Sequence, residues 1–451
     1  MLQRHIDVAR RRQVPTLVVI VGFALIGVVM GWLLSEREAR AEGGSLTMEQ
    51  AVAIALERNR DAIAARLEMR AAELDKVAAG LYPNPVLSYS IGNLPIGSGS
   101  PYNVTSGAPA SPGFFSQPVH NVALAEIIDV WSKRGARLRA ADRGLEHRRF
   151  AVEDALREIA YAVRSAFADV VREQSERQLS YDIRDRYAET VRLSRTRFSA
   201  GEISESEFRK IELEGLKYQT AVIAADTEYD LARNKLAALL ALPSVADLPQ
   251  PLVDEVPSEP ALPEAALVAR ALERRPDVRA AERARALAEA TLGSARREAL
   301  PDLTLSANYT HSEFTVSGDN PNTLGFGPEL PLPLFDRNQA NIGRAELDIR
   351  RAANETARLE IVVRSEVGEA ARKFERAKLL LGVFEQGGML DRADNALRVA
   401  EKSYKAGAIS LIELLEAQRT YLETRAEYLR AQYDQRQSRI DLRRVVGSDL
   451  K

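Results

Sequence analysis

The stretch ALERRPDVRAA, residues 271–281, decides the fold, because it repeats ALERNRDAIAA at residues 55–65. A second pair recurs at nearly the same spacing: FSAGEIS at residues 198–204 and YKAGAIS at residues 404–410. Self-similarity at one long spacing is typical of a duplicated structural unit. The chain is therefore interpreted as two half-copies of about 200 residues each.

Both halves have the same predicted order of elements, namely a helix, a β-hairpin and a long helical hairpin. The first repeat covers residues 42–242, with its β-hairpin at 86–130 and its helical hairpin at 132–242. The second repeat covers residues 264–451, with its β-hairpin at 303–332 and its helical hairpin at 335–446. The proline-rich stretch 243–263 is predicted to link them.

Local patterns support these elements. Thr47 and Gln50 fit a capping box that opens the first helix. The stretches VLSYSIGN, from residue 86, and LTLSANYTHSEFTV, from residue 303, alternate apolar and polar residues with the period of a strand. The helical hairpins are free of proline, and the second carries a heptad rhythm, which favours long packed helices. That rhythm comprises Leu415, Leu422 and Leu429 with Leu414, Tyr421 and Tyr428.

The N-terminus is typical of a targeting segment. Four arginines within residues 4–12 precede an apolar run at residues 14–34, and Ala39-Arg40-Ala41 offers a small-x-small cleavage site. We predict a signal peptide at residues 1–41 that is cleaved near Ala41. The run is also long enough for an uncleaved membrane anchor, and the residues alone leave that alternative open.

Composition excludes several classes of function. Lys and Arg together number 62 against 64 Asp and Glu, which argues against nucleic-acid binding. The chain has no cysteine, so neither disulfides nor thiolate metal sites are expected. No catalytic constellation or cofactor motif is found, and we predict no metal site, because the histidines lack a paired ligand spacing. The four histidines are His5, His120, His147 and His311.

The predicted hairpins constrain the assembly. Strands that cross a membrane cannot leave open edges in lipid, so their sheet must close into a barrel. Four strands are too few for closure, whereas two copies would supply eight strands and three copies twelve. The alternative is a water-soluble coiled-coil scaffold in which the strands are ordinary caps.

The order of elements and several motifs resemble the TolC family of outer-membrane efflux proteins, with a further similarity to its CzcC-like heavy-metal branch. The resemblance covers essentially everything after the targeting segment. The motifs that carry it are ALERN and ALERRPD, LYPNPVLSYS from residue 81, ALPDLTLSANY from 299, DVWSKRGARLRAA from 129, LPLFDRNQANIGRAE from 332, and both AG-x-IS turns.

The resemblance implies a mainly α fold with a small β part. In this TolC-like channel-tunnel, four strands per chain form a twelve-stranded transmembrane β-barrel in a homotrimer, continued by a long coiled-coil α-barrel. It implies an outer-membrane location with a periplasmic extension, and a passive duct rather than an enzyme. The implied partners are a periplasmic adaptor, an inner-membrane transporter of the RND type and outer-membrane lipid. Alternatives are a periplasmic coiled-coil adaptor and the outer-membrane component of a type I secretion system.

The two AG-x-IS turns are predicted to be the tips of the helical hairpins. Their glycines suit the left-handed backbone at a helix C-terminus, and Ser204 and Ser410 followed by a glutamate fit a capping box twice. The family resemblance implies that these tips contact the adaptor. The predicted contact residues are Ala200, Gly201, Ile203, Ala406, Gly407 and Ile409.

Carboxylates beside these turns are the candidates for a periplasmic aperture. Glu413 and Glu416 lie three residues apart and so share one helix face, whereas the first half has Glu207 followed by Lys210. A ring of carboxylates around a narrow opening would attract cations. The resemblance places the constricting acidic residues at Glu413, Glu416 and Glu207. Ile409 stands where the family pattern has an arginine, so the contacts that hold the aperture closed would differ.

Overall fold

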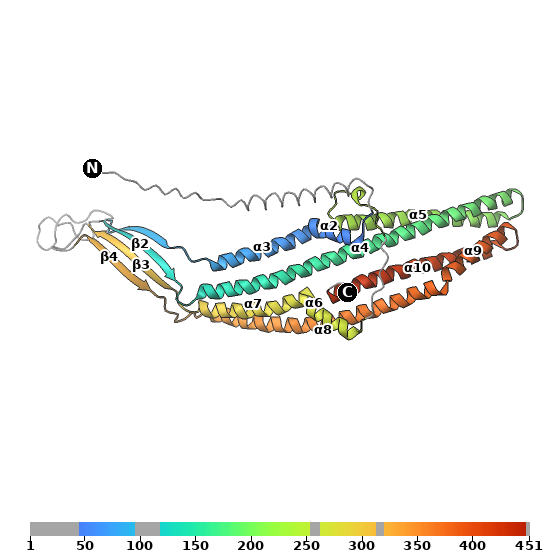
Figure 1. Cartoon of the computed structure of the whole chain (residues 1–451). Coiled ribbons are helices and arrows are strands. Elements are labelled where there is room, and N and C mark those ends of the chain that lie inside the picture. The colour runs from blue at the N-terminus through green and yellow to red at the C-terminus, as the bar shows by residue number, and fades with distance from the viewer. Residues whose placement is uncertain (1–44, 95–117, 253–261, 313–319, 448–451) are drawn as a thin grey trace, which may run out of the picture. The chain divides into compact units, whose positions relative to one another are not determined.

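The computed structural model describes residues 45–94, 118–252, 262–312 and 320–447 (Figure 1). The chain is mainly helical with one four-stranded sheet, which confirms the predicted fold class. It divides into unit 1, Met1–Ile54 with Ala166–Val256, and unit 2, Ala55–Ser165 with Pro257–Lys451. The predicted signal peptide and nearly all of the glycine-rich loop after residue 94 lie outside the described residues. None of the described helices combines the length and apolar character needed to cross a membrane.

The sheet in unit 2 is antiparallel, with the strand order β1-β2-β3-β4 (Figure 1). Its strands are β1 (Val86–Gly92), β2 (Val119–Ile128), β3 (Leu303–Ser312) and β4 (Asn322–Glu329). The two predicted hairpins are joined by the pairing of β2 with β3, in which His120 lies directly opposite His311. The sheet therefore combines strands from both half-copies, and β1 and β4 are its edges.

The two faces of the sheet differ in chemistry. Register places alternate residues on opposite faces. One face carries large apolar side chains: Leu87, Tyr89, Ile91, Val122, Leu124, Leu305, Tyr309, Leu324 and Phe326. The other face is mostly polar or small, apart from Val86, Val119 and Ile127, and on it Asn121 Nδ2 donates to Thr310 Oγ1 at 3.0 Å. The apolar side chains are exposed, with Leu324 at 71% and Phe326 at 79%.

Each half opens with two helices instead of the single predicted helix. The first half has α2 (Met48–Arg58) and α3 (Arg60–Gly80), and the second has α6 (Glu264–Arg274) and α7 (Pro276–Glu298). The breaks fall at Asn59 and Arg275, whose backbones are extended. Asn59 caps α3, because its side chain accepts hydrogen bonds from two backbone N–H groups, and Pro276 disfavours a helical conformation at Arg275. The predicted capping box at the start of α2 is confirmed by reciprocal bonds between Thr47 and Gln50.

The long helical hairpins differ between the halves. In the first, α4 (Lys133–Ser199) runs unbroken for 67 residues, or about 100 Å, before α5 (Glu205–Leu239). In the second, the ascending segment is split into α8 (Gln339–Gly387) and α9 (Met389–Lys405), followed by α10 (Leu411–Val446). The split differs from the predicted continuous hairpin. Its cause is Gly388, which adopts a left-handed backbone with φ of 58°.

Apolar packing in unit 2 gathers where α6, α7, α8 and α10 meet. Its members are Leu267, Ala271, Val278, Val363, Val367, Ala370, Leu442, Val445 and Val446. The predicted heptad residues of α10 face its neighbours, with Leu414 and Leu429 buried and the others half-buried. In unit 1 the predicted linker is partly anchored, because Leu46 pairs with Pro251 and both Leu46 and Leu248 are buried.

Candidate functional site

The first helical tip, between α4 and α5 in unit 1, is a tight left-handed turn. Gly201 has φ of 77°, and the N–H of Glu202 donates to the carbonyl of Arg197 at 2.9 Å. This six-to-one bond defines a Schellman motif, which satisfies carbonyls that the helix end leaves free. Ser204 then caps α5, since its Oγ accepts the N–H of Glu207 at 3.2 Å. The predicted turn geometry is confirmed.

The second tip, between α9 and α10 in unit 2, has the same left-handed glycine and Schellman motif. Gly407 has φ of 71°, and the N–H of Ala408 donates to the carbonyl of Ser403 at 2.8 Å. Here the capping box is complete. Ser410 Oγ accepts the N–H of Glu413 at 3.3 Å, and Glu413 Oε2 accepts the N–H of Ser410 at 2.8 Å.

The three predicted aperture carboxylates have different surroundings. The carboxylate of Glu413 accepts a hydrogen bond in the capping box. Glu416 lies one turn further along α10, is exposed, and has no hydrogen bond or ion pair to any described residue. Glu207 contributes only its backbone N–H to the cap, so the predicted box is incomplete in the first half within the described residues. The carboxylates of Glu207 and Glu416, not that of Glu413, are therefore left available for other contacts.

The predicted adaptor-contact residues share a pattern at both tips. Ile203 and Ile409 are half-buried, whereas Ala200, Gly201, Ala406 and Gly407 are exposed. Each tip thus presents two small residues, an alanine and a glycine, beside one half-buried isoleucine. The structure brings Glu413, Glu416, Ile409 and Ser410 together in unit 2, whereas Glu207, Ile203 and Ser204 belong to unit 1.

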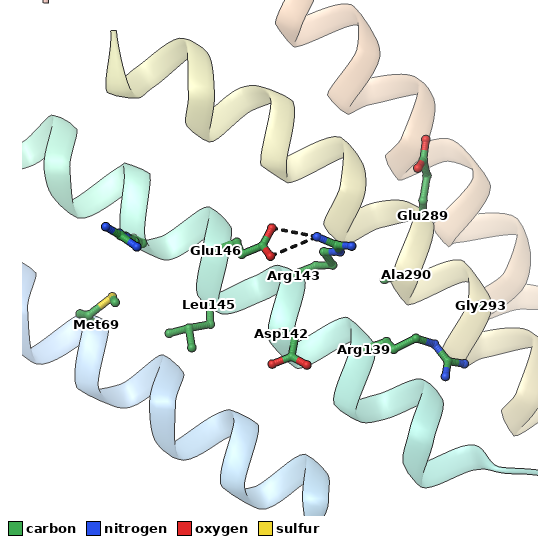
Figure 2. Close-up of a pocket in the computed structure, with 10 residues that line it drawn as sticks. Met69, Arg139, Asp142, Arg143, Leu145, Glu146, Glu289, Ala290 and Gly293 are labelled. Carbon is green, nitrogen blue, oxygen red and sulfur yellow. Dashed lines mark hydrogen bonds and ion pairs between the residues drawn. The ribbon is translucent and has the colours of Figure 1, made fainter. Parts of the chain in front are cut away.

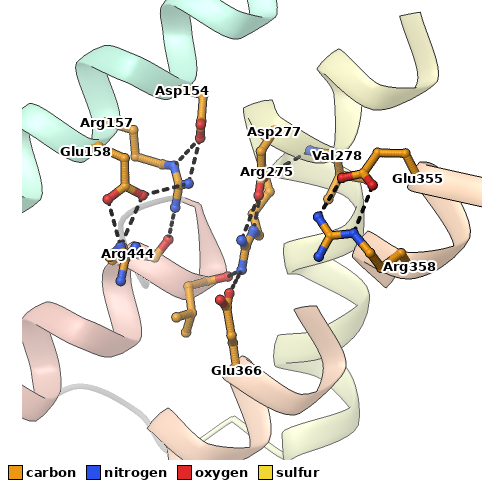
Figure 3. A network of polar contacts seen from close by, with 11 residues as sticks. Asp154, Arg157, Glu158, Arg275, Asp277, Val278, Glu355, Arg358, Glu366 and Arg444 are labelled. Atoms are coloured by element: carbon orange, nitrogen blue, oxygen red, sulfur yellow. Dashed lines mark hydrogen bonds and ion pairs between the residues drawn. The ribbon is translucent and has the colours of Figure 1, made fainter. Parts of the chain in front are cut away.

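A buried arginine is the feature of the ALERRPD motif that sequence reasoning missed (Figure 3). The side chain of Arg275 is 5% exposed; it donates to Asp277 Oδ2 at 2.7 Å and to Glu366 Oε2 at 2.6 Å. It also donates to the carbonyl of Val445 at 3.4 Å, so it joins α7, α8 and α10. A comparison of the two repeats could have singled out this residue. Arg275 stands at the position where the first half has Asn59, the residue that caps α3.

The Arg275 cluster perturbs the acid beside it. Burial by itself would raise the pKa of Asp277, but the hydrogen bonds and charge of Arg275 outweigh it and hold the pKa below its ordinary value. A neighbouring group extends the network: Arg157 donates to the carbonyl of Arg444 at 2.6 Å, and Arg444 pairs with Glu158 at 3.0 Å (Figure 3). These contacts indicate a structural role for the cluster, which holds α4, α7, α8 and α10 together.

Unit 2 also contains a cavity of about 580 Å³ between α3, α4 and α7 (Figure 2). Its acidic side chains are already paired: Asp142 with Lys76 at 2.7 Å, Glu146 with Arg143 at 3.0 Å, and Glu289 with Arg285 at 3.1 Å. Because these charges are matched by neighbours on the helices, the cavity offers no set of converging free carboxylates.

The fold brings two of the supposedly scattered histidines together. His120 on β2 and His311 on β3 are cross-strand partners, with ring centres 6.4 Å apart. The two histidines have no paired ligand spacing in the sequence, where 190 positions separate them, and only strand register brings them together. In the part of the chain that the structure describes, no group of three or more histidine, cysteine, aspartate or glutamate residues is arranged to hold a metal.

Comparisons with known proteins agree with this architecture. Residues 267–448 match the family described as Outer membrane efflux protein. The chain is 27% identical over 410 residues to the cobalt-zinc-cadmium resistance protein CzcC of Cupriavidus metallidurans, covering 90% of this chain and 91% of that protein. It is 28% identical over 230 residues to the cation efflux system protein CusC of Escherichia coli K12, covering 49% of this chain and 50% of that protein.

Solved structures show the same fold. A crystal structure of CusC superposes with a TM-score of 0.72 at 20% identity, covering 89% of this chain and 92% of that one. The outer membrane protein VceC of Vibrio cholerae gives a TM-score of 0.70 at 18% identity, covering 90% and 97% of the two chains. With the duplicated helical hairpins and the four-stranded sheet, these similarities show that the chain has the fold of the TolC-like outer membrane channels and that its residues 267–448 match the Outer membrane efflux protein family.

Proposed function

We propose that the protein is a passive outer-membrane duct, built as a homotrimer, through which a tripartite system expels its substrate. The observation that carries this proposal is the sheet, which has an exposed apolar face and an opposite face that is mostly small and polar. An apolar outside and a polar inside are what a spanning barrel with an aqueous interior requires. A soluble scaffold would have no use for exposed side chains such as Leu324 and Phe326.

The sheet has two open edges that suit closure. β1 and β4 lie at opposite ends of the sheet, and with four antiparallel strands they run in opposite directions. The free edge of β4 in one copy would therefore pair antiparallel with β1 of the next, a head-to-tail contact that closes into a ring. We propose that three copies form a twelve-stranded barrel, with the helices forming the periplasmic extension.

The proposed partners, a periplasmic adaptor and an inner-membrane transporter, are supported by the family resemblance and by the small residues at the helical tips. The small exposed residues at both tips leave room for close helix packing, which supports docking of a periplasmic adaptor there. An inner-membrane transporter of the RND type would supply energy, so this chain needs no catalytic site. Because CzcC and CusC are named for cobalt, zinc and cadmium resistance and for cation efflux, metal cations are the proposed substrate class. Export with cleavage near Ala41 completes the proposal.

The aperture is proposed at the α9–α10 tip. Three copies of Glu413 and Glu416 around the trimer axis would concentrate negative charge at the opening, and Glu207 would add to it from the other tip. Rings of carboxylates attract cations and are blocked by them. Lys210, standing where the second half has Glu416, would reduce that charge on the first tip.

Single-channel current in planar bilayers tests both the proposed duct and the proposed aperture. The purified chain is expected to conduct, and divalent cations added on the periplasmic side are expected to block it. The double variant Glu413→Ala with Glu416→Ala is expected to lower that block, whereas Lys402→Ala, on α9 and outside the proposed ring, serves as the control. Unchanged block in the double variant would refute the aperture assignment. Recovery of the protein in the soluble periplasm would refute the duct and favour the scaffold.

A further inference from the structure

We infer that His120 and His311 form a two-histidine binding site for a borderline divalent transition metal, such as Zn²⁺, Ni²⁺ or Cu²⁺. The inference goes beyond the proposed duct, and only the account of the site's position at a membrane–water interface rests on that duct. It starts from register: the two residues are directly opposite on neighbouring antiparallel strands, so both side chains project from the same face. Imidazole nitrogens are the ligands that these three metals share.

The spacing of the rings suits one shared ion. Their centres lie 6.4 Å apart, with the planes tilted by 33°. An ion bound to one nitrogen of each ring at about 2.1 Å holds the ring centres at roughly 5 to 6.5 Å, so small side-chain rotations are sufficient. The planes need not be parallel, because the ion bridges ring edges. Two protein ligands leave the remaining coordination positions to water.

The neighbours of His311 fix the tautomer that a metal needs. Nδ1 of His311 lies 2.8 Å from Oδ1 of Asn322, and the hydroxyl of Tyr309 donates to the same oxygen at 2.6 Å. An amide oxygen only accepts, so Nδ1 of the ring must donate its proton. Nε2 of His311 therefore carries a free lone pair. Orientation of a histidine ligand through its other ring nitrogen is a regular feature of metal sites.

His120 is held in a matching way. Its Nδ1 lies 2.8 Å from the hydroxyl of Tyr89, and the two rings stack with centres 6.1 Å apart. A tyrosine hydroxyl accepts as well as donates, so the tautomer with a proton on Nδ1 and a lone pair on Nε2 fits these contacts. Both histidines are thus positioned by partners on the same face of the sheet, and both are half-buried rather than free to rotate in solvent.

The place of the site explains how a polar pair is tolerated on the apolar face. Val119, Ser312 and Gly92 form the last paired row of the sheet, and the histidines lie one row before it. Tyrosine is the residue type that marks membrane–water interfaces, and Tyr89 and Tyr309 flank the pair. The ion would therefore sit at the loop end of the sheet, within reach of water. It would also tie β2 to β3, the pairing that joins the two half-copies.

Metal binding is tested on the purified full chain in detergent, without a polyhistidine tag. Isothermal titration with Zn²⁺ is expected to show one ion per chain. His120→Asn and His311→Asn are each expected to weaken binding at least tenfold, and the double variant no further, because either loss removes the chelate. Asn322→Ala is expected to weaken binding about tenfold by releasing the ring of His311. His147→Asn is the matched control, since that ring contacts the carbonyl of Ala280 on a helix.

A spectroscopic measurement needs no variant. Cu²⁺ bound to the wild-type chain is expected to show electron paramagnetic resonance splitting from two equivalent nitrogens, reduced to one in either single variant. Zn²⁺ is expected to raise the melting temperature of the wild type but not of His120→Asn. Wild-type affinity in both single variants, a one-nitrogen Cu²⁺ spectrum in the wild type, or equal competition by Mg²⁺ would each overturn the site.

Discussion

Two carboxylates in the first two turns of α10 have different roles. Glu413 closes the capping box with Ser410, whereas Glu416 is exposed and has no partner among the described residues. The cap stabilises the helix start, while the second carboxylate contributes charge to the tip. If Glu416 belongs to the proposed aperture, mutations at Ser410 and Glu416 are therefore expected to change stability and conductance separately.

The variants Ser410→Ala and Glu416→Gln test this separation. Ser410→Ala is expected to lower the free energy of unfolding by about 1 kcal/mol, because it leaves backbone N–H groups of α10 uncapped. Glu416→Gln is expected to leave the melting temperature unchanged and to reduce divalent-cation block of single-channel current. Thermal unfolding followed by circular dichroism, beside bilayer recording, distinguishes the two. A stability loss in Glu416→Gln as large as that in Ser410→Ala would contradict the assignment.

Arg275 is the residue whose loss we expect to be most damaging in unit 2. Arg275→Ala leaves Asp277 and Glu366 without their shared cation in a largely buried site, which is expected to cost about 3 kcal/mol. The control Arg358→Ala removes an exposed ion pair with Glu355 and is expected to have no measurable effect. Chemical denaturation of both variants measures the difference. Equal stability of the two would show that the buried cluster contributes nothing.

The same cluster predicts how stability depends on pH. The pKa of Asp277 in the folded chain lies below its ordinary value of 3.8. A carboxyl with a lowered folded pKa contributes stability that is present above its unfolded pKa and is lost as the pH falls through the folded pKa. The difference in melting temperature between wild type and Asp277→Asn is therefore expected to be constant from pH 7 to about pH 5 and to shrink below about pH 4. A constant difference down to pH 2 would contradict this.

At the scale of elements, the two long hairpins differ in whether their first helix is continuous. α4 is continuous for 67 residues, whereas the corresponding segment of the second half is interrupted at Gly388 between α8 and α9. The interruption lies between the sheet-proximal part of the hairpin and the tip that carries Glu416. A bend at Gly388 would therefore redirect that tip without altering the packing of α8.

Two glycine substitutions test whether the interruption is built into the backbone. Gly388→Ala places a side chain at φ of 58° and is expected to destabilise by about 1 kcal/mol through backbone strain alone, since the described structure has no atom within 4 Å of the new methyl group. Gly382→Ala, inside α8 with equally open space, is expected to stabilise by about 0.5 to 1 kcal/mol. Urea titrations measure both. Opposite signs support the interruption, and stabilisation by both would contradict it.

Features that depend on residues close together in the chain could be predicted from the sequence, whereas contacts between distant residues could not. The period of two in the strands and the absence of proline in α4 are local signals, so both elements were predictable near their observed bounds. The breaks at Asn59 and Arg275 were also local, but one helical pattern runs across both and concealed them. The Arg275–Glu366 tie and the His120–His311 pair join residues far apart in the chain, and no local pattern fixes which residues meet. The aperture residues remain predictions, because they require several copies.

At the scale of the whole molecule, the proposed trimer depends on pairing between the two sheet edges, β1 and β4. The chain contains no cysteine, so an introduced pair reports only its own contact. Ser90→Cys on β1 is to be combined in turn with Thr323→Cys, Gly325→Cys and Gly327→Cys on β4, all on the polar face. At least one pair is expected to give disulfide-linked dimers and trimers on non-reducing gels.

Each single-cysteine variant is the control for this cross-linking and is expected to give no ladder of three bands. A ladder that stops at the dimer would favour an eight-stranded ring, and the absence of cross-links from every pair would contradict closure between β1 and β4. Gly325→Cys also introduces a side chain 2.5 Å from Asn308 Oδ1, so its folding is to be checked separately by circular dichroism.

The exposed face of the sheet has a consequence for biogenesis. A single copy of the chain exposes Leu87, Leu324 and Phe326, on a sheet with two unpaired edges. Exposed apolar surface and unpaired strand edges make a chain prone to aggregate with other copies. The helices can fold from local contacts, whereas the proposed barrel needs lipid and neighbouring copies to cover the sheet. If the sheet inserts as proposed, maturation is expected to require a chaperone that shields these strands until insertion.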